Sequence, residues 1–424
     1  MSDPAPLLVV YDRGAASPGE LGPALAGLGP LVFAVPDTEH VRLVRPVLAE
    51  LGRVVDLSGD EATDVARVAS LRPRGVVTYA EQMLRCAAAF TESLGLPGHS
   101  RPTADRLTDK HQQRERQRAA GADNVRSRLI AEPGQWTDAL GQVGFPAVVK
   151  PARGQASRST YPVLGPADAD QVHSRIFGPA AAGGDRWVVE EMLVGRPELP
   201  HGDYVSVESL SGPWGTRPIA VTGKHPLRRP FRETGHFWPS HLSAPEQAQL
   251  IALATATVTA LGVTTGITQT EIKLTPNGPH VIEVNGRLGG HIAELARRSC
   301  GVDLIRLAAL SALGLAEPPA LLRPDRVYFQ YNVPAPVGSA VFLGVHGAAD
   351  VRRIPGITGY RPYVRPGDRL DHGVMTYQLD LLCGDTASHP EMAHAIEAAL
   401  ERLEFEYLDD IGRRHRSRMV MVDE

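Results

Sequence analysis

A predicted β-hairpin in the second half of the chain constrains the fold more than any other feature of the sequence. The runs ITQTEIKL (267–274) and HVIEV (280–284) have the composition of strands, and the Asn-Gly pair at 277–278 between them is typical of a tight turn. Each strand carries one acid, Glu271 or Glu283, which we expect to point towards the same side. Two carboxylates brought together repel each other unless a cation holds them, so the hairpin predicts a metal site.

The stretch VIEVNGRLGGH (281–291) extends this prediction. Alternate residues of a strand point the same way, so Glu283, Asn285 and Arg287 would share one face. Carboxylate and amide oxygens suit Mg²⁺ bound together with phosphates, and an arginine beside them can reach an anion. Solvated strand acids are the alternative for either acid alone, and the asparagine and arginine on the same face weigh against it.

The first hundred residues alternate between apolar runs and helix-like stretches. The expected strands are LLVV (7–10), LVFAV (31–35), RVVDL (53–57) and GVVTY (75–79). This βαβα order predicts an α/β architecture with a small parallel sheet covered by helices. The Gly- and Pro-rich segment 95–105 is the first predicted boundary, and the polar helix after it stops at Gly121.

From residue 147 the pattern becomes richer in strands. Before the hairpin we expect strands at 147–150, 187–190, 204–210 and 217–223. One long helix over 245–262 interrupts them, and another runs from 302 to about 315. The mixed segment after about 320 ends in a predicted helix at 390–404, and the basic run 413–418 is expected to be a solvated tail.

The composition excludes several classes of protein. The 424 residues suffice for two or three domains, and the net charge of −4 gives no general attraction to nucleic acid or membranes. The three cysteines form no CxxC pair, which argues against a disulfide framework or a structural zinc site. We see no signal peptide and no transmembrane stretch, and we therefore expect a cytoplasmic protein without nucleic-acid or membrane partners.

Three further stretches could bind a nucleotide, although each has an ordinary alternative. Lys150 precedes the small-residue loop 152–160, whose backbone N–H groups could approach phosphates, but a plain surface loop is equally consistent. Lys110 begins a polar helix, where a lysine is usually solvated. The run VVEEML (188–193) could present backbone groups to a purine or could simply end a strand.

The stretch KHPLRRPFRETGHFWPS (224–240) combines basic residues with aromatic ones. A charged run is commonly a solvated loop. Phe231, Phe237 and Trp238 instead predict a loop that closes over a ligand.

The order of these stretches resembles the ATP-grasp superfamily of carboxylate–amine ligases over residues 1 to about 315. The resemblance rests on the succession DK, VVKP, EEML, TEIKL and EVNGRLGG. Within the superfamily, DYVSVESL, FRETGHFWPS, QTEIKL and the spacing of Glu283, Arg287 and Gly290 are most similar to bacterial L-amino-acid ligases of the bacilysin-synthesis type.

The resemblance implies a fold with several parts. These are an N-terminal Rossmann-like α/β domain (1–100), a small ATP-grasp subdomain that forms the lid (101–190), a large ATP-grasp subdomain with the metal site (191–315) and a C-terminal subdomain (316–424). The two ATP-grasp subdomains and the C-terminal extension would be α+β.

The resemblance also implies roles for individual residues. ATP would be held by Lys110, Lys150, the lid residues Ser157, Ser159 and Thr160, the adenine-side residues Glu190, Glu191, Met192 and Leu193, and, at the ribose, Glu198 or Asp203. Glu271, Glu283 and Asn285 would bind two Mg²⁺ ions, with Mn²⁺ as an alternative metal. The catalytic residues would be Lys224 at the γ-phosphate and Arg287, and the substrate pocket would contain Glu81, Glu233, His236, Arg287, Gly290 and His291.

The implied reaction activates an amino-acid carboxylate as an acyl phosphate and joins it to an amine, with release of ADP and phosphate. The alternative within this class is a ligase that loads an amino acid onto a carrier protein or a natural-product scaffold amine. A carboxylase acting on bicarbonate and a non-catalytic nucleotide-binding module are more distant alternatives. The implied partners are small carboxylate and amine substrates, and a carrier protein and a homodimer stay open.

Overall fold

The computed structural model describes residues 5–178, 186–338, 340–370, 373–419 and 421. Its N-terminal part is a parallel sheet with the strand order β3-β2-β1-β4. The strands are β1 (Leu7–Val10), β2 (Leu31–Val35), β3 (Arg53–Asp56) and β4 (Gly75–Val77), and the helices are α1 (Pro18–Leu25), α2 (Glu39–Leu51), α3 (Glu61–Leu71) and α4 (Leu84–Leu94). The predicted α/β domain with four strands is confirmed.

Two helices lead from this domain to a second, antiparallel sheet. They are α5 (Arg101–Leu107) and α6 (Lys110–Ala119). The sheet has the order β5-β8-β6-β7 and contains β5 (Ser127–Ile130), β6 (Ala147–Pro151), β7 (Tyr161–Val163) and β8 (Trp187–Glu191). A short 3₁₀ turn (Pro133–Gln135), α7 (Trp136–Val143) and α8 (Pro166–Phe177) accompany it, and the core between helices and strands is apolar.

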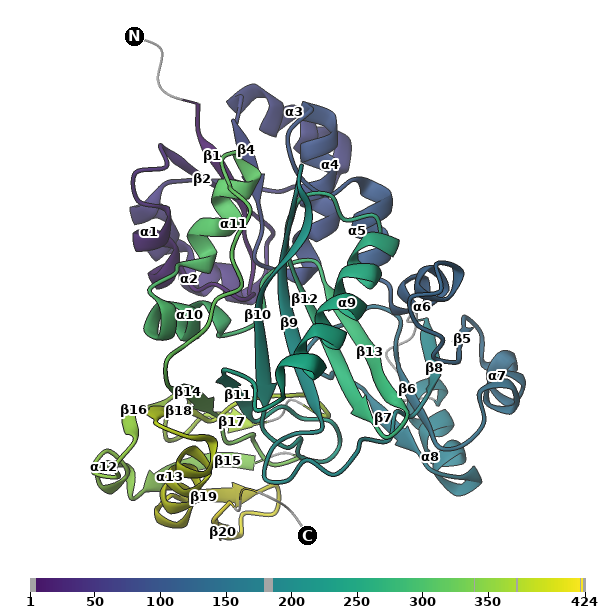
Figure 1. Ribbon diagram of the computed structural model, residues 1–424, viewed down its shortest axis with the longest axis vertical. Coiled ribbons are helices and arrows are strands. Elements are labelled where there is room, and N and C mark those ends of the chain that lie inside the picture. Colours follow the sequence, from purple (N-terminus) through teal and green to yellow (C-terminus); the bar gives the residue numbers. More distant parts are fainter. Residues whose placement is uncertain (1–4, 179–185, 339, 371–372, 420, 422–424) are drawn as a thin grey trace.

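The largest sheet is antiparallel and has the order β13-β12-β9-β10-β11-β14-β18-β16. Its strands are β9 (Tyr204–Gly212), β10 (Gly215–Lys224), β11 (Gly235–Trp238), β12 (Gly266–Thr275), β13 (Gly278–Asn285), β14 (Val327–Tyr331), β16 (Ile357–Pro362) and β18 (Asp380–Thr386). Helix α9 (Ala244–Ala260) lies along β9, β12 and β13 (Figure 1). A capping box fixes the start of α9, because Ser243 and Glu246 hydrogen-bond each other reciprocally.

Helices α10 (Ile292–Cys300) and α11 (Leu304–Ala312) follow the hairpin and join the large sheet to the N-terminal domain, since α11 packs against α1 and β4. The C-terminal part adds a four-stranded sheet in the order β17-β15-β19-β20. It consists of β15 (Ala340–His346), β17 (Arg369–Leu370), β19 (Glu404–Asp409) and β20 (Arg414–Ser417), with α12 (Ala348–Val351) and α13 (His389–Arg402). The large sheet thus takes strands from both sides of residue 315, and the predicted division into four domains stays a prediction.

Three expectations about local structure are wrong. The run 413–418 is not a tail, because β20 pairs with β19, and the helix predicted at 390–404 is therefore not the last element. The stretch 224–240 is only partly a loop: Phe237 and Trp238 lie in β11 with exposed fractions of 0% and 1%, so both rings pack in the core. Arg287 does not lie on the strand with Glu283, because β13 ends at Asn285.

Within the part of the chain that the structure describes, none of the helices has both the length and the apolar composition needed to cross a membrane.

Candidate active site

Near residues 205–208 the large sheet has an apolar face and an opposite, polar face, and the alternation within β9 shows why; further along β9, Leu210 and its partner Ile267 make the second face apolar. Val205 and Val207 point towards α9 and belong to an apolar cluster with its side chains. Ser206 and Glu208, between and after them, must point to the opposite face. Because directly paired residues in antiparallel strands share a face, the register extends this polar face to the neighbouring strands. It contains Glu283 and Asn285 on β13, Gln269 and Glu271 on β12, Lys224 on β10 and His236 on β11.

The two predicted metal-binding acids lie directly opposite each other. Glu271 pairs with Glu283 across β12 and β13. Burial raises the pKa of Glu271 to about 8; Lys224 opposes the rise, and Glu233 and Glu283 add to it. Burial acts in the same direction on Glu283, but Lys110 and Lys150 hold its pKa below the ordinary value. The negative charge of Glu283 is thus balanced by nearby lysines, whereas Glu271 has too few cations near it.

The pair fits a divalent cation that arrives with phosphates. A cation beside Glu271 and Glu283 would relieve the repulsion between them, and Asn285 adds an amide oxygen. Among the described residues, no group of three or more His, Cys, Asp or Glu side chains is arranged to hold a metal ion by itself. Phosphate oxygens or water would therefore have to complete the coordination, which is the usual way in which proteins bind Mg²⁺ with a nucleotide.

Two lysines lie on either side of this acid pair. Asp109 caps α6 by accepting from the Gln112 N–H, which places Lys110 at the first helical position. The Lys110 Nζ lies 3.3 Å from Glu283 Oε2 and donates to the Gly154 carbonyl at 2.8 Å. Lys110 therefore connects the predicted metal-binding acid Glu283 to the predicted lid loop.

Lys224 lies on the other side and is completely buried. Its Nζ is 3.1 Å from Glu233 Oε1 and 3.7 Å from Glu271 Oε1. Burial works to lower the pKa of Lys224, but the two acids hold it above its ordinary value. The side chain is therefore a fixed positive charge at the edge of the predicted phosphate site.

Arg287 lies just beyond β13 and faces the N-terminal domain. Its Nε is 3.4 Å from Glu81 Oε2, and one of its terminal nitrogens is 3.5 Å from Asn285 Oδ1. Glu81 begins a 3₁₀ turn (Glu81–Met83) directly after β4, and burial raises its pKa to about 7 although Arg287 opposes the rise. The carboxyl end of the parallel sheet thus delivers an acid to the polar face of the large sheet.

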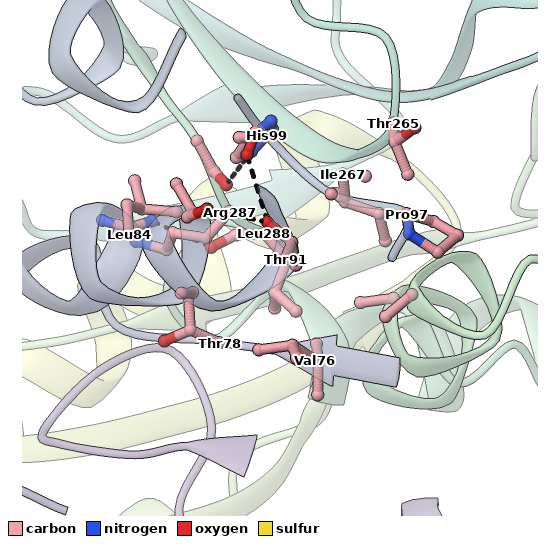
Figure 2. Close-up of a pocket in the computed structure, with 18 residues that line it drawn as sticks. Val76, Thr78, Leu84, Thr91, Pro97, His99, Thr265, Ile267, Arg287 and Leu288 are labelled. Atoms are coloured by element: carbon pink, nitrogen blue, oxygen red, sulfur yellow. Dashed lines mark hydrogen bonds between the residues drawn. The ribbon is translucent and has the colours of Figure 1, made fainter. Parts of the chain in front are cut away.

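A small cavity of about 60 Å³ lies behind Arg287. Figure 2 shows Leu84 and Thr91 of α4 on one side of it and Ile267 of β12 on another. The His99 Nε2–H donates to the Gly286 carbonyl at 3.0 Å, so His99 fixes the backbone that precedes Arg287. The cavity is the place where the N-terminal domain and the large sheet meet.

Glu190, one of the predicted adenine-side residues, lies in a buried ion-pair cluster with Lys150 and Arg114. Glu190 accepts from Lys150 Nζ at 2.8 Å and from two guanidinium nitrogens of Arg114 at 3.0 and 2.9 Å. Arg114 also donates to the carbonyls of Val281 and Ile282 on β13. The cluster therefore joins the four-stranded sheet that contains β6 and β8, called the small sheet from here on, to the large sheet. The Lys150 side chain points to Glu190.

The chain after β8 is extended. Glu191 forms an ion pair with Arg126 at 2.8 Å, and the Met192 N–H donates to the Pro146 carbonyl at 3.0 Å. Leu193 continues the same segment. Only backbone groups of 191–193 that these contacts leave open could bind an adenine edge.

The two alternatives for the ribose acid lie in different surroundings. Glu198 is engaged by Arg196 and by His241, whose Nε2 is 2.6 Å away. The Asp203 carboxylate lies against the segment after β8, because a Cβ on Gly195 would meet Asp203 Oδ2 at 1.8 Å. Asp203 is held there by Lys273 Nζ at 2.6 Å.

The predicted lid loop touches two other segments. Ser157 donates to the Phe231 carbonyl at 2.8 Å, and the Ser159 N–H donates to the Val374 carbonyl at 2.8 Å. Thr160 closes the loop by donating its N–H to Ser157. The N–H of Thr376 returns to the Ala156 carbonyl at 2.8 Å. The loop therefore lies closed against residues of the C-terminal part.

The same C-terminal segment reaches the predicted substrate pocket. The Glu233 N–H donates to the Thr376 hydroxyl at 3.1 Å, and His291 Nε2 is 3.1 Å from Gln378 Oε1. His236 hydrogen-bonds to the backbone of Gly290, and burial keeps the pKa of His236 well below its ordinary value. Glu233, His236, Gly290 and His291 are thus brought together next to Lys224 and Arg287.

Sequence reasoning missed four residues in this region. Arg114 lies four residues after Lys110 and so on the same side of α6, which the helical period could have shown. Glu208 and Gln269 lie on the polar strand faces of YVSVESL and QTEIKL, where alternation could have found them. Gln378 had no local pattern, because it reaches His291 only through the fold.

Comparisons with known proteins agree with this geometry. Residues 143–294 match the family model described as the ATP-grasp domain. Carnosine synthase 1 of Gallus gallus is 32% identical over 281 residues, which cover 62% of this chain and 29% of that protein. Alanine–anticapsin ligase of Bacillus subtilis is 24% identical over 284 residues, which cover 63% of this chain and 57% of that protein. The chain therefore matches less than two thirds of the length of either relative.

A solved structure resembles nearly the whole chain. The L-amino acid ligase from Bacillus licheniformis superposes with a TM-score of 0.78 at 19% identity, covering 96% of this chain and 99% of that one. At this identity the likeness concerns the fold, which confirms the predicted fold class.

Proposed function

Because this chain contains an ATP-grasp domain, as its sequence predicted, we propose that the protein is an ATP-dependent, ADP-forming ligase that joins an amino-acid carboxylate to an amine. The observation that carries the proposal is the convergence on one sheet face of the acid pair Glu271 and Glu283 with Lys224 and Arg287. The relatives named for carnosine synthesis and for joining alanine to anticapsin support an amino acid as one substrate.

The first step is phosphoryl transfer from ATP to the substrate carboxylate. A carboxylate oxygen attacks the γ-phosphorus, the bond to the β–γ bridging oxygen breaks, and an acyl phosphate and ADP form. Lys224 balances charge at the γ-phosphate, and Arg287 balances charge on the reacting carboxylate. When bound at Glu271, Glu283 and Asn285, Mg²⁺ neutralises phosphate charge; the number of ions, and whether Mn²⁺ serves, are part of the proposal.

The second step is attack of an amine on the acyl phosphate, which expels phosphate and gives an amide. Arg287 faces the oxyanion that forms at the carbonyl carbon. The lid loop 153–160 excludes water, which would otherwise hydrolyse the acyl phosphate. Glu81, Glu233, His236 and His291 line the space for the two substrates, and the side chains of Glu81 and Glu233 can hold an ammonium group.

The same proposal assigns residues to the phosphates, the adenine and the ribose of ATP. Lys110 and Lys150 supply positive charge beside the phosphates, together with Ser157, Ser159 and Thr160 of the lid. The segment Glu190–Leu193 borders the adenine. Asp203 holds the ribose in preference to Glu198 because of its place beside Gly195.

The test is release of ADP from Mg²⁺-ATP in the presence of the twenty amino acids, singly and in pairs, with mass spectrometry of the products. A dipeptide mass that appears together with ADP supports the proposal and identifies the substrates. ADP release with one amino acid and no dipeptide supports loading onto a carrier protein or a scaffold amine. Nucleotide binding without ADP release under any pairing argues for a non-catalytic module.

A variant pair controls this assay. Glu283→Gln removes one predicted metal ligand and is expected to abolish ADP release. Glu115→Gln removes an exposed acid of α6, whose side chain is 52% exposed, and is expected to leave ADP release unchanged. Full turnover by Glu283→Gln would overturn the assignment of the metal site.

A further inference from the structure

Three buried polar side chains form one row across the large sheet. Gln269 on β12 is paired with Glu208 on β9 and, on its other side, with Asn285 on β13. Directly paired residues of antiparallel strands point to the same face, so the three side chains lie next to one another. Their exposed fractions are 0% for Glu208, 4% for Gln269 and 7% for Asn285. Buried polar groups are usually hydrogen-bonded, but Glu208 Oε1 is buried without a hydrogen bond of ordinary geometry.

The hydrogen bonds in the row have a direction. The Asn285 amide nitrogen donates to Gln269 Oε1 at 3.1 Å. Because this bond occupies the nitrogen, the oxygen Oδ1 is the end of Asn285 that faces Arg287 and the acid pair. Since Gln269 presents its oxygen to Asn285, its NH₂ group is left for the Glu208 carboxylate, against which the Gln269 amide lies.

Glu208 also holds the turn that carries Arg287. Its Oε2 accepts from the Gly289 N–H at 3.2 Å. A Cβ on Gly289 would meet Gln269 Nε2 at 2.1 Å and Glu208 Oε1 at 2.8 Å, so any larger residue would have to push these two side chains aside. The carboxylate thus contacts a donor from the strand row and a donor from the turn, while burial excludes it from the substrate.

We propose that Glu208 is a positioning residue whose acceptor-only carboxylate sets the orientation of the Gln269 and Asn285 amides and thereby presents Asn285 Oδ1 to the metal. An amide can turn either end towards a neighbour, but an ionised carboxylate offers only acceptors, so Glu208 in its charged form dictates which end of Gln269 faces it. Gln269 then dictates which end of Asn285 faces the site. This inference rests on the proposed metal site and adds two residues to it.

The test measures metal affinity instead of turnover. Binding of Mn²⁺ to the protein with a non-hydrolysable ATP analogue is followed by electron paramagnetic resonance, and folding is followed by thermal melting. In Glu208→Gln the single oxygen cannot serve both the Gly289 N–H and the Gln269 NH₂ group. We expect Mn²⁺ to bind roughly 10- to 100-fold more weakly, the usual effect of losing a partner behind a metal ligand.

An exchange of the two side chains provides the rescue. In Glu208→Gln/Gln269→Glu, Gln at 208 can donate to Glu at 269 and accept from Gly289, and Glu at 269 can still accept from Asn285. The direction of the row is restored, so we expect Mn²⁺ affinity within a few-fold of the wild type. Ser209→Ala, on the opposite face of β9, is the matched control and should leave Mn²⁺ affinity unchanged.

The outcomes separate the two proposals. A wild-type protein that does not bind Mn²⁺ with the nucleotide analogue contradicts the proposed metal site itself. If the wild type binds Mn²⁺ and folded Glu208→Gln binds it with an affinity within twofold of the wild type, only the proposed role of Glu208 is overturned. If Glu208→Gln does not fold, the folded exchange variant decides: affinity near the wild type supports the inference, and a tenfold or greater loss overturns it.

Discussion

The small and the large sheet treat a buried carboxylate in opposite ways. In the small sheet, burial works to raise the pKa of Glu190, yet Arg114 and Lys150 hold it at about 2. In the large sheet, burial raises the pKa of Glu271 to about 8 and that of Glu208 to about 7, against nearby cations that are too few or too far. The difference teaches that Glu190 is a structural charge with its own partners, whereas the charged form of Glu271 lacks enough counter-charge within the protein, as expected of an acid that a bound cation would balance.

The largest expected effect is on activity, from Glu271→Gln. Removing the charge should lower ADP formation by roughly 100- to 1,000-fold or more, the scale of losing a charged group at the reacting centre. The ligand-free variant should melt at the same temperature as the wild type or higher, because an uncompensated buried charge is gone. Steady-state kinetics and thermal melting measure the two effects, and a fall in both would show that Glu271 is instead a structural charge.

The corresponding substitution in the small sheet, Glu190→Gln, should lower the stability of the ligand-free protein. Glu190→Gln leaves Arg114 and Lys150 buried without their counter-charge, and we expect a loss of about 3–5 kcal/mol in unfolding free energy. Urea unfolding measures it, with Glu115→Gln as the exposed control that should stay within about 0.5 kcal/mol. An unchanged urea midpoint for Glu190→Gln would contradict the structural role of this cluster.

A third pair of acids sharpens the comparison at the ribose. Glu198 is occupied by Arg196 and His241, whereas Asp203 has one partner, Lys273, and lies beside Gly195. Asp203→Asn should raise the KM for ATP roughly tenfold through loss of a charged hydrogen bond. Glu198→Gln should change the same KM less than twofold. If Glu198→Gln raised the KM for ATP more than Asp203→Asn did, Glu198 would be the better candidate for binding the ribose.

Asp380 extends the comparison to the far end of the large sheet, where burial raises the pKa of its carboxyl to about 7. Because this lies above the ordinary value of 3.8, its contribution to stability is fully present below about pH 4 and is lost as the pH rises through 7. Asp380→Asn mimics the neutral form. Its stability relative to the wild type should therefore increase from pH 5 to pH 8 by on the order of 1–3 kcal/mol. If melting experiments gave the same stability difference between Asp380→Asn and the wild type at pH 5 and pH 8, the Asp380 carboxylate would have a partner that balances its charge.

The smallest expected effect concerns the C-terminal segment. Gln378→Ala removes the partner of His291 without touching the acid pair. We expect the KM for one amino-acid substrate to rise roughly threefold to tenfold, the scale of one neutral hydrogen bond, while the KM for ATP stays constant. A rise in the KM for ATP alone would place Gln378 with the lid.

Much of the fold was predictable because its cause is local. Apolar and alternating runs predicted β6 and β8 of the small sheet and β9, β10, β12 and β13 of the large one, and the Asn-Gly turn predicted the hairpin that places Glu271 opposite Glu283. The other strands of these two sheets were not predicted. The expectation that 224–240 is a closing loop was wrong for Phe237 and Trp238, which lie in β11. Aromatic residues occur both in lids and in core strands, so the sequence did not distinguish the two. The roles of the individual site residues stay predictions until the variants above are measured.

The sequence alone determined which residue types alternate on each strand and hence which face of the sheet is polar, since the two-residue period is a property of the extended backbone. Only the tertiary structure decided which of those polar residues have partners. Glu190 meets Arg114 from a helix 76 residues earlier, and Glu208 meets Gly289 from a turn 81 residues later. Burial and the distance to opposite charges set the behaviour of a carboxylate, and both depend on segments that only the fold brings together.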